Sequence, residues 1–108
     1  MNDLTNEQKI LLSEMYKDYL CQLDTLQPEK ANYFYSSIEI TEKYFDNRSV
    51  VYISELCWKL KSKGYINCYP GDNLANDISI TDKTIIYFEY KFKRNISALI
   101  SFICSLKR

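Results

Sequence analysis

The four cysteines are the side chains of this sequence best suited to metal binding or nucleophilic chemistry. They are Cys21, Cys57, Cys68 and Cys104, separated by 36, 11 and 36 residues. No two form a C-x-x-C pair, and the chain has no histidine to complete a zinc site. We therefore expect no metal and no cofactor, with Cys57 and Cys104 in apolar packing and Cys21 and Cys68 exposed.

Acidic residues are the next candidates for catalysis, as general acids and bases. Asp3, Glu7, Glu14 and Asp18 are spaced along one predicted helix as a solvated face, not as a converging pair. The sequence has no histidine to act as a general base and no glycine-rich loop to hold phosphate. The expected protein is therefore not an enzyme.

Length and composition indicate one small globular domain covering residues 1–108. The chain is 46% hydrophobic and 15% aromatic, with 14 basic and 14 acidic residues and a net charge of zero. Two glycines and two prolines are too few for a linker or a low-complexity tract. The first seven residues lack the features of a signal peptide, so we expect a cytoplasmic protein with reduced thiols.

The spacing of apolar residues predicts helices in the first part of the chain. A helix is expected over residues 6–23, beginning with a capping box at Thr5. Two helices joined by a polar turn are expected over residues 37–63, and Ser49 is the N-cap of the second. Gly64 then ends that helix in the left-handed conformation.

The rest of the chain predicts a hairpin followed by more helix, which makes the fold class mainly α with a small β component (α+β). Short alternating runs over residues 65–81 predict two strands with a long tip at residues 70–76. Near-helical spacing continues over residues 82–106, with a bend around residues 94–95. The aromatic run at residues 33–35 fits either a short helix or a strand.

Two sequence segments resemble the winged helix-turn-helix superfamily. LKSKGYI at residues 60–66 is similar to the end of a recognition helix that enters a wing strand, and ISITDKTIIYFE at residues 78–89 resembles the second wing strand of MarR-like and PadR-like regulators. Thr84 stands where those families usually have glycine. The resemblance implies a two-stranded wing, a long C-terminal helix, a helix from Ser49 in the DNA major groove, and a dimer built by the end helices.

The charge of each segment fits this implied DNA contact only in part. Residues 49–63 have a net charge of +2, whereas the hairpin segment 64–82 has −3 and no lysine or arginine. The residues expected to reach phosphates and base edges lie away from the apolar stripe of the helix. They are Arg48, Ser49, Tyr52, Ser54, Lys59 and Lys61. The lysines near the helix end fit equally well a solvated end that balances the helix dipole.

A second group of cations follows the hairpin. Residues 83–108 have a net charge of +5, and the cluster consists of Lys83, Lys91, Lys93 and Arg94. Three roles are compatible with it: a wider DNA footprint, an acidic protein partner, or charge balance for the first 48 residues, whose net charge is −4.

The terminal helix has more apolar side chains than so small a core is expected to cover. They are Ile96, Leu99, Ile100, Ile103 and Leu106. We expect them to form a twofold homodimer interface. The uncharged run at residues 95–106 has twelve residues, whereas a membrane span needs about 20.

The leading hypothesis is a small dimeric winged-helix protein that binds duplex DNA and regulates transcription. The alternative is a winged-helix module that binds protein, such as an accessory or inhibitory factor from a mobile element. The zero net charge and the acidic hairpin favour this alternative.

Overall fold

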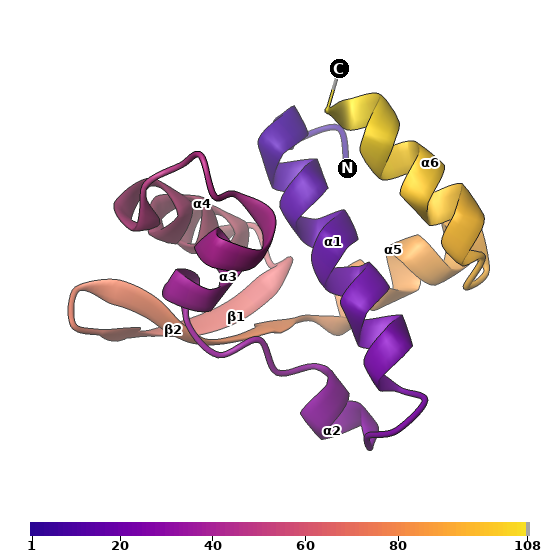
Figure 1. Ribbon diagram of the computed structural model, residues 1–108, viewed down its shortest axis with the longest axis horizontal. Coiled ribbons are helices and arrows are strands. Elements are labelled where there is room, and N and C mark those ends of the chain that lie inside the picture. The colour runs from indigo at the N-terminus through magenta and orange to yellow at the C-terminus, as the bar shows by residue number, and fades with distance from the viewer. Residues whose placement is uncertain (108) are drawn as a thin grey trace.

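The computed structural model describes residues 1–107 as a mainly helical α+β fold with one antiparallel hairpin (Figure 1). Along the chain the elements are α1 (Asn6–Gln22), α2 (Pro28–Ala31), α3 (Ser37–Tyr44), α4 (Val50–Ser62), β1 (Ile66–Gly71), β2 (Leu74–Ile80), α5 (Asp82–Phe92) and α6 (Ile96–Leu106). The predicted bounds of the first helix and of the helix pair at residues 37–63 are confirmed to within a residue or two. Helix α2 was not predicted.

Helix α1 is the centre of the fold, with the α3, α4 and hairpin layer on one side and α6 on the other (Figure 1). The predicted capping box begins it: the Gln8 N–H donates to Thr5 Oγ1 at 3.2 Å, and the Thr5 N–H donates to Gln8 Oε1 at 2.9 Å. Its neighbouring residues Leu11 and Leu12 are both fully buried. Because consecutive residues point in different directions on a helix, α1 is covered on more than one side.

Helices α3 and α4 pack together over the hairpin. Ser49 is the N-cap of α4, as predicted, and its hydroxyl accepts a hydrogen bond from the Tyr52 N–H at 3.1 Å. The buried stripe of α4 includes Ile53, Cys57 and Leu60. Gly64 follows the helix with φ of +84°, which confirms its role as a left-handed stop.

The hairpin has a tighter tip than the sequence predicted. Residues 70–76 were expected to form a long loop, but all except Asp72 and Asn73 belong to the strands. Both turn residues have positive φ, 54° and 62°, a conformation that Asp and Asn tolerate and that matches the twist of a two-residue hairpin. The strand register is irregular between Asn67 and Tyr69, and Pro70 lies within β1.

The aromatic run, whose state the sequence left open, belongs to an extended segment along β2. The Phe34 N–H donates to the Ile78 carbonyl at 2.8 Å, and the Ile78 N–H donates to the Tyr35 carbonyl at 3.0 Å. The side chain of Asn32 continues this pairing, since it donates to the Ile80 carbonyl at 2.7 Å and accepts from the Ile80 N–H at 2.9 Å. The segment therefore covers one edge of the hairpin.

The prediction of one long C-terminal helix is wrong, because this region forms two helices, α5 and α6. Lys93 and Arg94 both have positive φ, 50° and 61°, which stops α5. Asn95 then caps α6 by accepting a hydrogen bond from the Ala98 N–H at 3.1 Å. The break lies where the bend was predicted, but it turns the chain back, so that α6 packs along α1 (Figure 1).

Two further contacts attach α5 to the rest of the fold. The ring of Phe88 stacks on Tyr16 of α1 with centroids 5.0 Å apart. Thr84 is fully buried, and its hydroxyl donates to the Tyr65 carbonyl at 2.7 Å. The threonine that stands in place of the families' glycine therefore fixes α5 to the start of the hairpin.

Candidate nucleic-acid interface

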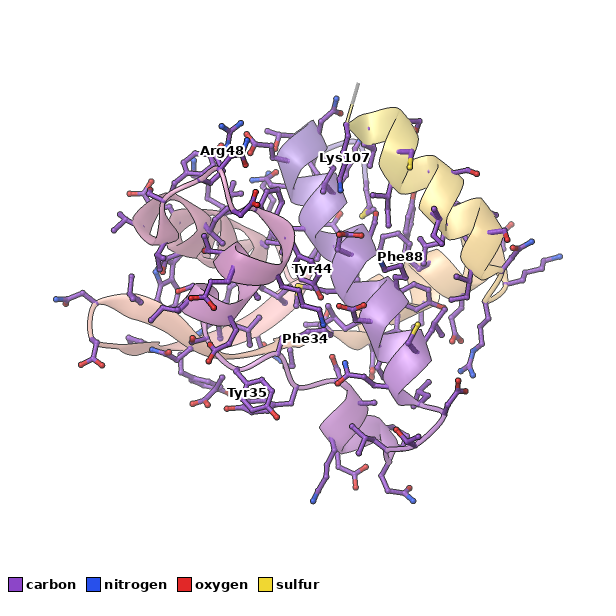
Figure 2. The ribbon with its side chains drawn as sticks, in the orientation of Figure 1. Phe34, Tyr35, Tyr44, Arg48, Phe88 and Lys107 are labelled. Carbon is purple, nitrogen blue, oxygen red and sulfur yellow. The ribbon has the colours of Figure 1, made fainter. Side chains whose placement is uncertain are left out.

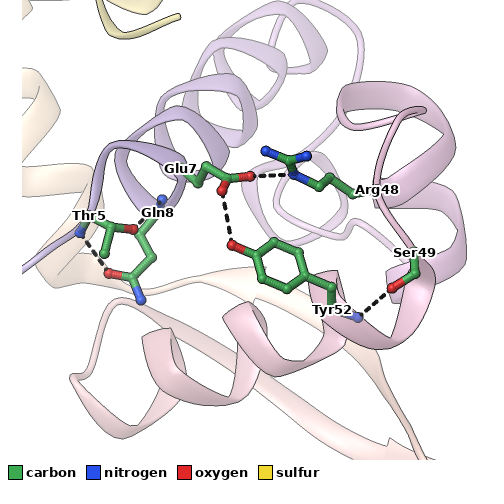
Figure 3. A network of polar contacts seen from close by, with 6 residues as sticks. All are labelled: Thr5, Glu7, Gln8, Arg48, Ser49 and Tyr52. Carbon is green, nitrogen blue, oxygen red and sulfur yellow. Dashed lines mark hydrogen bonds and ion pairs between the residues drawn. The ribbon is translucent and has the colours of Figure 1, made fainter.

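A carboxylate of α1 holds two of the predicted contact residues at the start of α4 (Figure 3). Glu7 Oε2 accepts from Arg48 Nε at 2.9 Å, and Glu7 Oε1 accepts from the Tyr52 hydroxyl at 2.9 Å. Ser49 lies beside them as the N-cap of α4. The structure thus brings together Arg48, Ser49 and Tyr52, together with Glu7, for which the sequence analysis predicted only a place on a solvated face.

Hydrogen bonds within this network shift the pKa values of its three side chains. The hydrogen bond from Arg48 lowers the pKa of the Glu7 carboxyl, and the same carboxylate raises the pKa of Arg48. Hydrogen bonding to Glu7 also raises the pKa of the Tyr52 hydroxyl. The Arg48 side chain remains 43% exposed. In Figure 3 the hydrogen bond to Glu7 runs from the Nε atom of its guanidinium group.

The exposed face of α4 continues from Tyr52 to Glu55 and Lys59, positions three or four residues apart. Val51 lies next to this face and is 62% exposed. Glu55 and Val51 were not among the predicted contacts, which were all basic or hydroxyl side chains. A carboxylate can accept from the amino group of cytosine, and an apolar side chain can contact a thymine methyl.

One predicted DNA contact, Ser54, is wrong, and a second, Lys61, is engaged within the chain. Ser54 is buried at 3% exposure, and its hydroxyl accepts from the Ala75 N–H at 2.6 Å, so it joins α4 to β2. Lys61 points to the other side of α4, where its ammonium donates to the Cys68 carbonyl at 2.5 Å and lies 4.9 Å from the centroid of the Tyr69 ring. Both side chains stabilise the contact between α4 and the hairpin.

The hairpin itself supplies no cation. From residue 64 to residue 82 the chain has Asp72, Asp77 and Asp82 and no lysine or arginine. The carboxylate of Asp77 accepts from the Tyr33 hydroxyl at 2.8 Å. Tyr69 is 57% exposed. Because its charge is negative, the hairpin is poorly suited to contacts with DNA phosphates.

Several members of the cationic cluster after the hairpin have contacts within the chain. Lys83 donates to the Lys63 carbonyl at 2.9 Å, and its ammonium lies 4.2 Å from the Tyr65 ring centroid. Arg94 pairs with Glu89 at 2.8 Å. The ammonium of Lys91 lies 4.3 Å from the Phe102 ring centroid. The cations of this cluster therefore lie on α5 and in the turn that follows it, and these three have partners within the chain.

Two central residues of the predicted dimer interface are buried within the single chain, so the prediction is wrong for them. Leu99 and Ile103 are 0% and 4% exposed within the single chain, where α6 packs on α1. Ile96 and Leu106 are half-buried, and Ile100 is 44% exposed. The break after α5 lets the chain cover most of its own apolar stripe.

The cysteine environments were predicted correctly for two positions. Cys57 is buried and Cys21 is exposed, whereas Cys68 is buried and Cys104 is exposed, the reverse of what was expected. Burial raises the pKa of the Cys57 thiol to about 12 and also raises the pKa of Cys68. Residues 1–107 contain no cluster of three potential metal ligands. Within the same range, no helix has the length and apolar character needed to cross a bilayer.

Compared with known protein families, curated proteins and solved structures, the chain has no significant match.

Proposed function

We propose that this chain is a winged helix-turn-helix protein of the cytoplasm that binds duplex DNA through the N-terminal half of α4 and regulates transcription. The observation that carries the proposal is the exposed start of α4, where Glu7 holds Arg48 and Tyr52 side by side next to the Ser49 cap. A helix N-terminus with oriented donors is suited to phosphate contacts and to entry into the major groove.

The arrangement of the surrounding elements supports this proposal. The pair α3 and α4 packs on a hairpin, as the resemblance implies, and the exposed residues Val51, Tyr52, Glu55 and Lys59 offer apolar, hydroxyl, carboxylate and ammonium groups. These groups suit thymine methyl, cytosine amino and phosphate contacts. The proposed footprint excludes Ser54 and Lys61, which are committed to the hairpin.

The proposed footprint has few cations, so it can contact few DNA phosphates. The salt dependence of binding can therefore be predicted. Arg48 and Lys59 are its cations, and the hairpin adds none. Counterion release from about two phosphates gives a plot of log affinity against log salt with a slope of about −2. Binding to random DNA should therefore be weak and only moderately sensitive to salt.

The test is a fluorescence anisotropy titration of a labelled random duplex at several salt concentrations between about 50 and 200 mM. Arg48→Ala and Lys59→Ala should each weaken binding and reduce the magnitude of the slope by about one. Lys30→Ala, which removes an exposed cation on α2, is the matched control and should bind like the wild type. No binding at the lowest salt, or equal binding by all three variants, would contradict the proposal.

The acidic hairpin favours a second candidate, a winged-helix module that binds protein. Tyr69 and Val51, 57% and 62% exposed, lie on the hairpin and α4 and would supply apolar contacts. Asp72 and Asp77 would repel phosphate but could attract a basic partner surface. The same titration separates the candidates, since this one predicts no salt-dependent affinity for DNA.

A homodimer through α6 stays a prediction of the resemblance. Of the five residues first expected at its interface, Ile100 is the one with a large exposed fraction, and Ile96 and Leu106 are half-buried. A dimer would therefore use the outer face of α6 and leave Leu99 and Ile103 in the core.

A further inference from the structure

The aromatic run that the DNA interface does not use lines a surface groove. Two hollows, of about 200 and 370 Å³, adjoin each other between the end of α1, α2, the extended segment and α3. Both are lined by Gln22, Tyr33 and Tyr35, so they form one feature, which we term the aromatic groove. Tyr44 lines one end of it, and Leu26, which is 41% exposed, lines the other.

Two tyrosine rings stand between the hollows. The ring centroids of Tyr33 and Tyr35 are 4.5 Å apart with an interplanar angle of 59°. The Tyr33 ring is anchored by the hydrogen bond from its hydroxyl to Asp77 at 2.8 Å. Tyr35 is 59% exposed, and Figure 2 shows it on the side of the molecule away from Arg48. A rigid ring of proline size could pack in the hollow on either side of this pair.

Tyr35 is presented in a backbone conformation that is uncommon for an aromatic residue. Its φ is +64°, in the left-handed region. The paired hydrogen bonds with Ile78 on β2 hold the backbone there. Such conformations cost free energy and are found where the surrounding structure fixes them, often at binding sites. The sheet therefore turns the Tyr35 ring outward instead of into the core.

The charges around the aromatic groove favour a cationic occupant. Glu39 lines one hollow and Glu29 the other, and Asp77 lies behind Tyr33. Of the two lysines that line the groove, Lys43 is paired with Asp18 at 2.9 Å. The groove and its immediate surroundings thus hold three carboxylates and, apart from Lys43, one ammonium, that of Lys30.

From this geometry we infer that the aromatic groove binds a proline-rich peptide segment carrying basic residues. Proline-rich segments in the polyproline II conformation dock on grooves lined by aromatic rings, because their shape is fixed before binding and little chain entropy is lost. The prolines would pack beside Tyr33 and Tyr35, and the basic side chains would pair with Glu29 and Glu39. This site lies on a different surface from the start of α4, so it does not depend on DNA binding.

The test uses a fluorescein-labelled peptide of three Pro-Pro-Arg repeats, titrated with the full chain and followed by anisotropy. We expect a dissociation constant on the order of 0.1 mM. Tyr35→Gly should raise it about tenfold, and Glu29→Gln about threefold. Glycine adopts positive φ without strain, so this substitution removes the ring while keeping the backbone. Tyr35→Asn provides a second variant that tolerates the same conformation.

Matched controls distinguish the proposed contact from general attraction. Tyr90→Ala removes a tyrosine that is 88% exposed on α5 and should leave the affinity unchanged. A peptide of three Gly-Gly-Arg repeats has the same charge without the preformed shape, and one of three Pro-Pro-Glu repeats has the shape with the opposite charge. Both should bind at least about fivefold more weakly.

Three results would overturn the inference. The first is no binding of the Pro-Pro-Arg peptide at about 1 mM. The second is equal binding of the Gly-Gly-Arg peptide, which would indicate attraction by charge alone. The third is displacement of the peptide by tetramethylammonium at matching concentration, which would identify a cage for a small organic cation.

Discussion

Helix α1 contacts α6 and the start of α4, the two regions that were predicted from the sequence to bind a partner. The two contacts differ in polarity and in exposure to solvent. On one side α6 places Leu99 and Ile103 against it, both almost completely buried. On the other side the start of α4 touches it through Glu7, Arg48 and Tyr52, whose side chains remain partly exposed. One junction is apolar and closed, and the other is polar and open to solvent.

The difference shows how a small domain uses its apolar residues. Burying an apolar side chain is favourable. An apolar stripe that can pack against the core of its own chain is therefore buried there and is not left exposed for a partner. Exposed ion pairs gain little free energy, so they can be exchanged for contacts with a ligand at little cost. Between two candidate surfaces, the polar one is therefore the better place to look for function.

The largest expected effect concerns the closed junction. Leu99→Ala removes a fully buried side chain and should lower the free energy of unfolding by about 3 kcal/mol. Ile100→Ala, one residue along but 44% exposed, should cost less than about 1 kcal/mol. Urea denaturation of both variants measures this, with sedimentation to record the oligomeric state. Similar losses for both would indicate that the outer face of α6 is also covered.

A medium effect is expected where α4 meets the hairpin. Ser54→Ala leaves the buried Ala75 N–H without its partner and should lower the free energy of unfolding by about 1–2 kcal/mol. Ser49→Gly, at the exposed cap of the same helix, should cost only a few tenths of a kcal/mol. Denaturation curves for the pair decide this, and a larger loss at Ser49 would contradict the assignment of Ser54 to the core.

The smallest effect belongs to the open junction. A double-mutant cycle of Glu7→Gln and Arg48→Ala should give a coupling of about 0.2–1 kcal/mol, reduced by salt because the pair is exposed. The folded state lowers the pKa of Glu7 below its ordinary value of 4.5, so its stabilisation is present above that pH. It is lost as the pH falls through the lowered pKa.

Unfolding curves of the wild type and Glu7→Gln between about pH 2 and 7 measure this dependence. The stability difference between the two proteins should shrink as Glu7 becomes protonated. A difference that stays constant over this range would mean that the carboxylate of Glu7 does not stabilise the fold.

Local sequence signals predicted the helices whose ends have capping residues. Ser49 and Gly64 set the ends of α4, and Thr5 begins α1, since each acts within one helical turn. The break after α5 was predicted only as a bend. Lys93 and Arg94 have no strong preference for positive φ, so the sharp reversal depends on the packing of α6 against α1.

The candidate site was predictable in part, for the same reason. The spacing of residues on α4 placed Arg48, Ser49 and Tyr52 on one exposed side, but the inward turn of Ser54 depends on a backbone N–H of β2, 21 residues away in the sequence. The role of Glu7 likewise depends on a contact across 41 residues. Local periodicity contains no information about such partners.

The extended segment along β2 also limits where this hairpin can pair with a strand of another copy. Because the segment pairs with β2 at Ile78, the hairpin has its remaining open edge on β1. That edge contains Pro70, an irregular register around Cys68, and a carbonyl already bound by the Lys61 ammonium. Proline, bulges and lysine are the devices that prevent one strand edge from joining another. Lys61, which the proposed DNA footprint excludes, thus lies where a lysine hinders pairing of this edge with another copy.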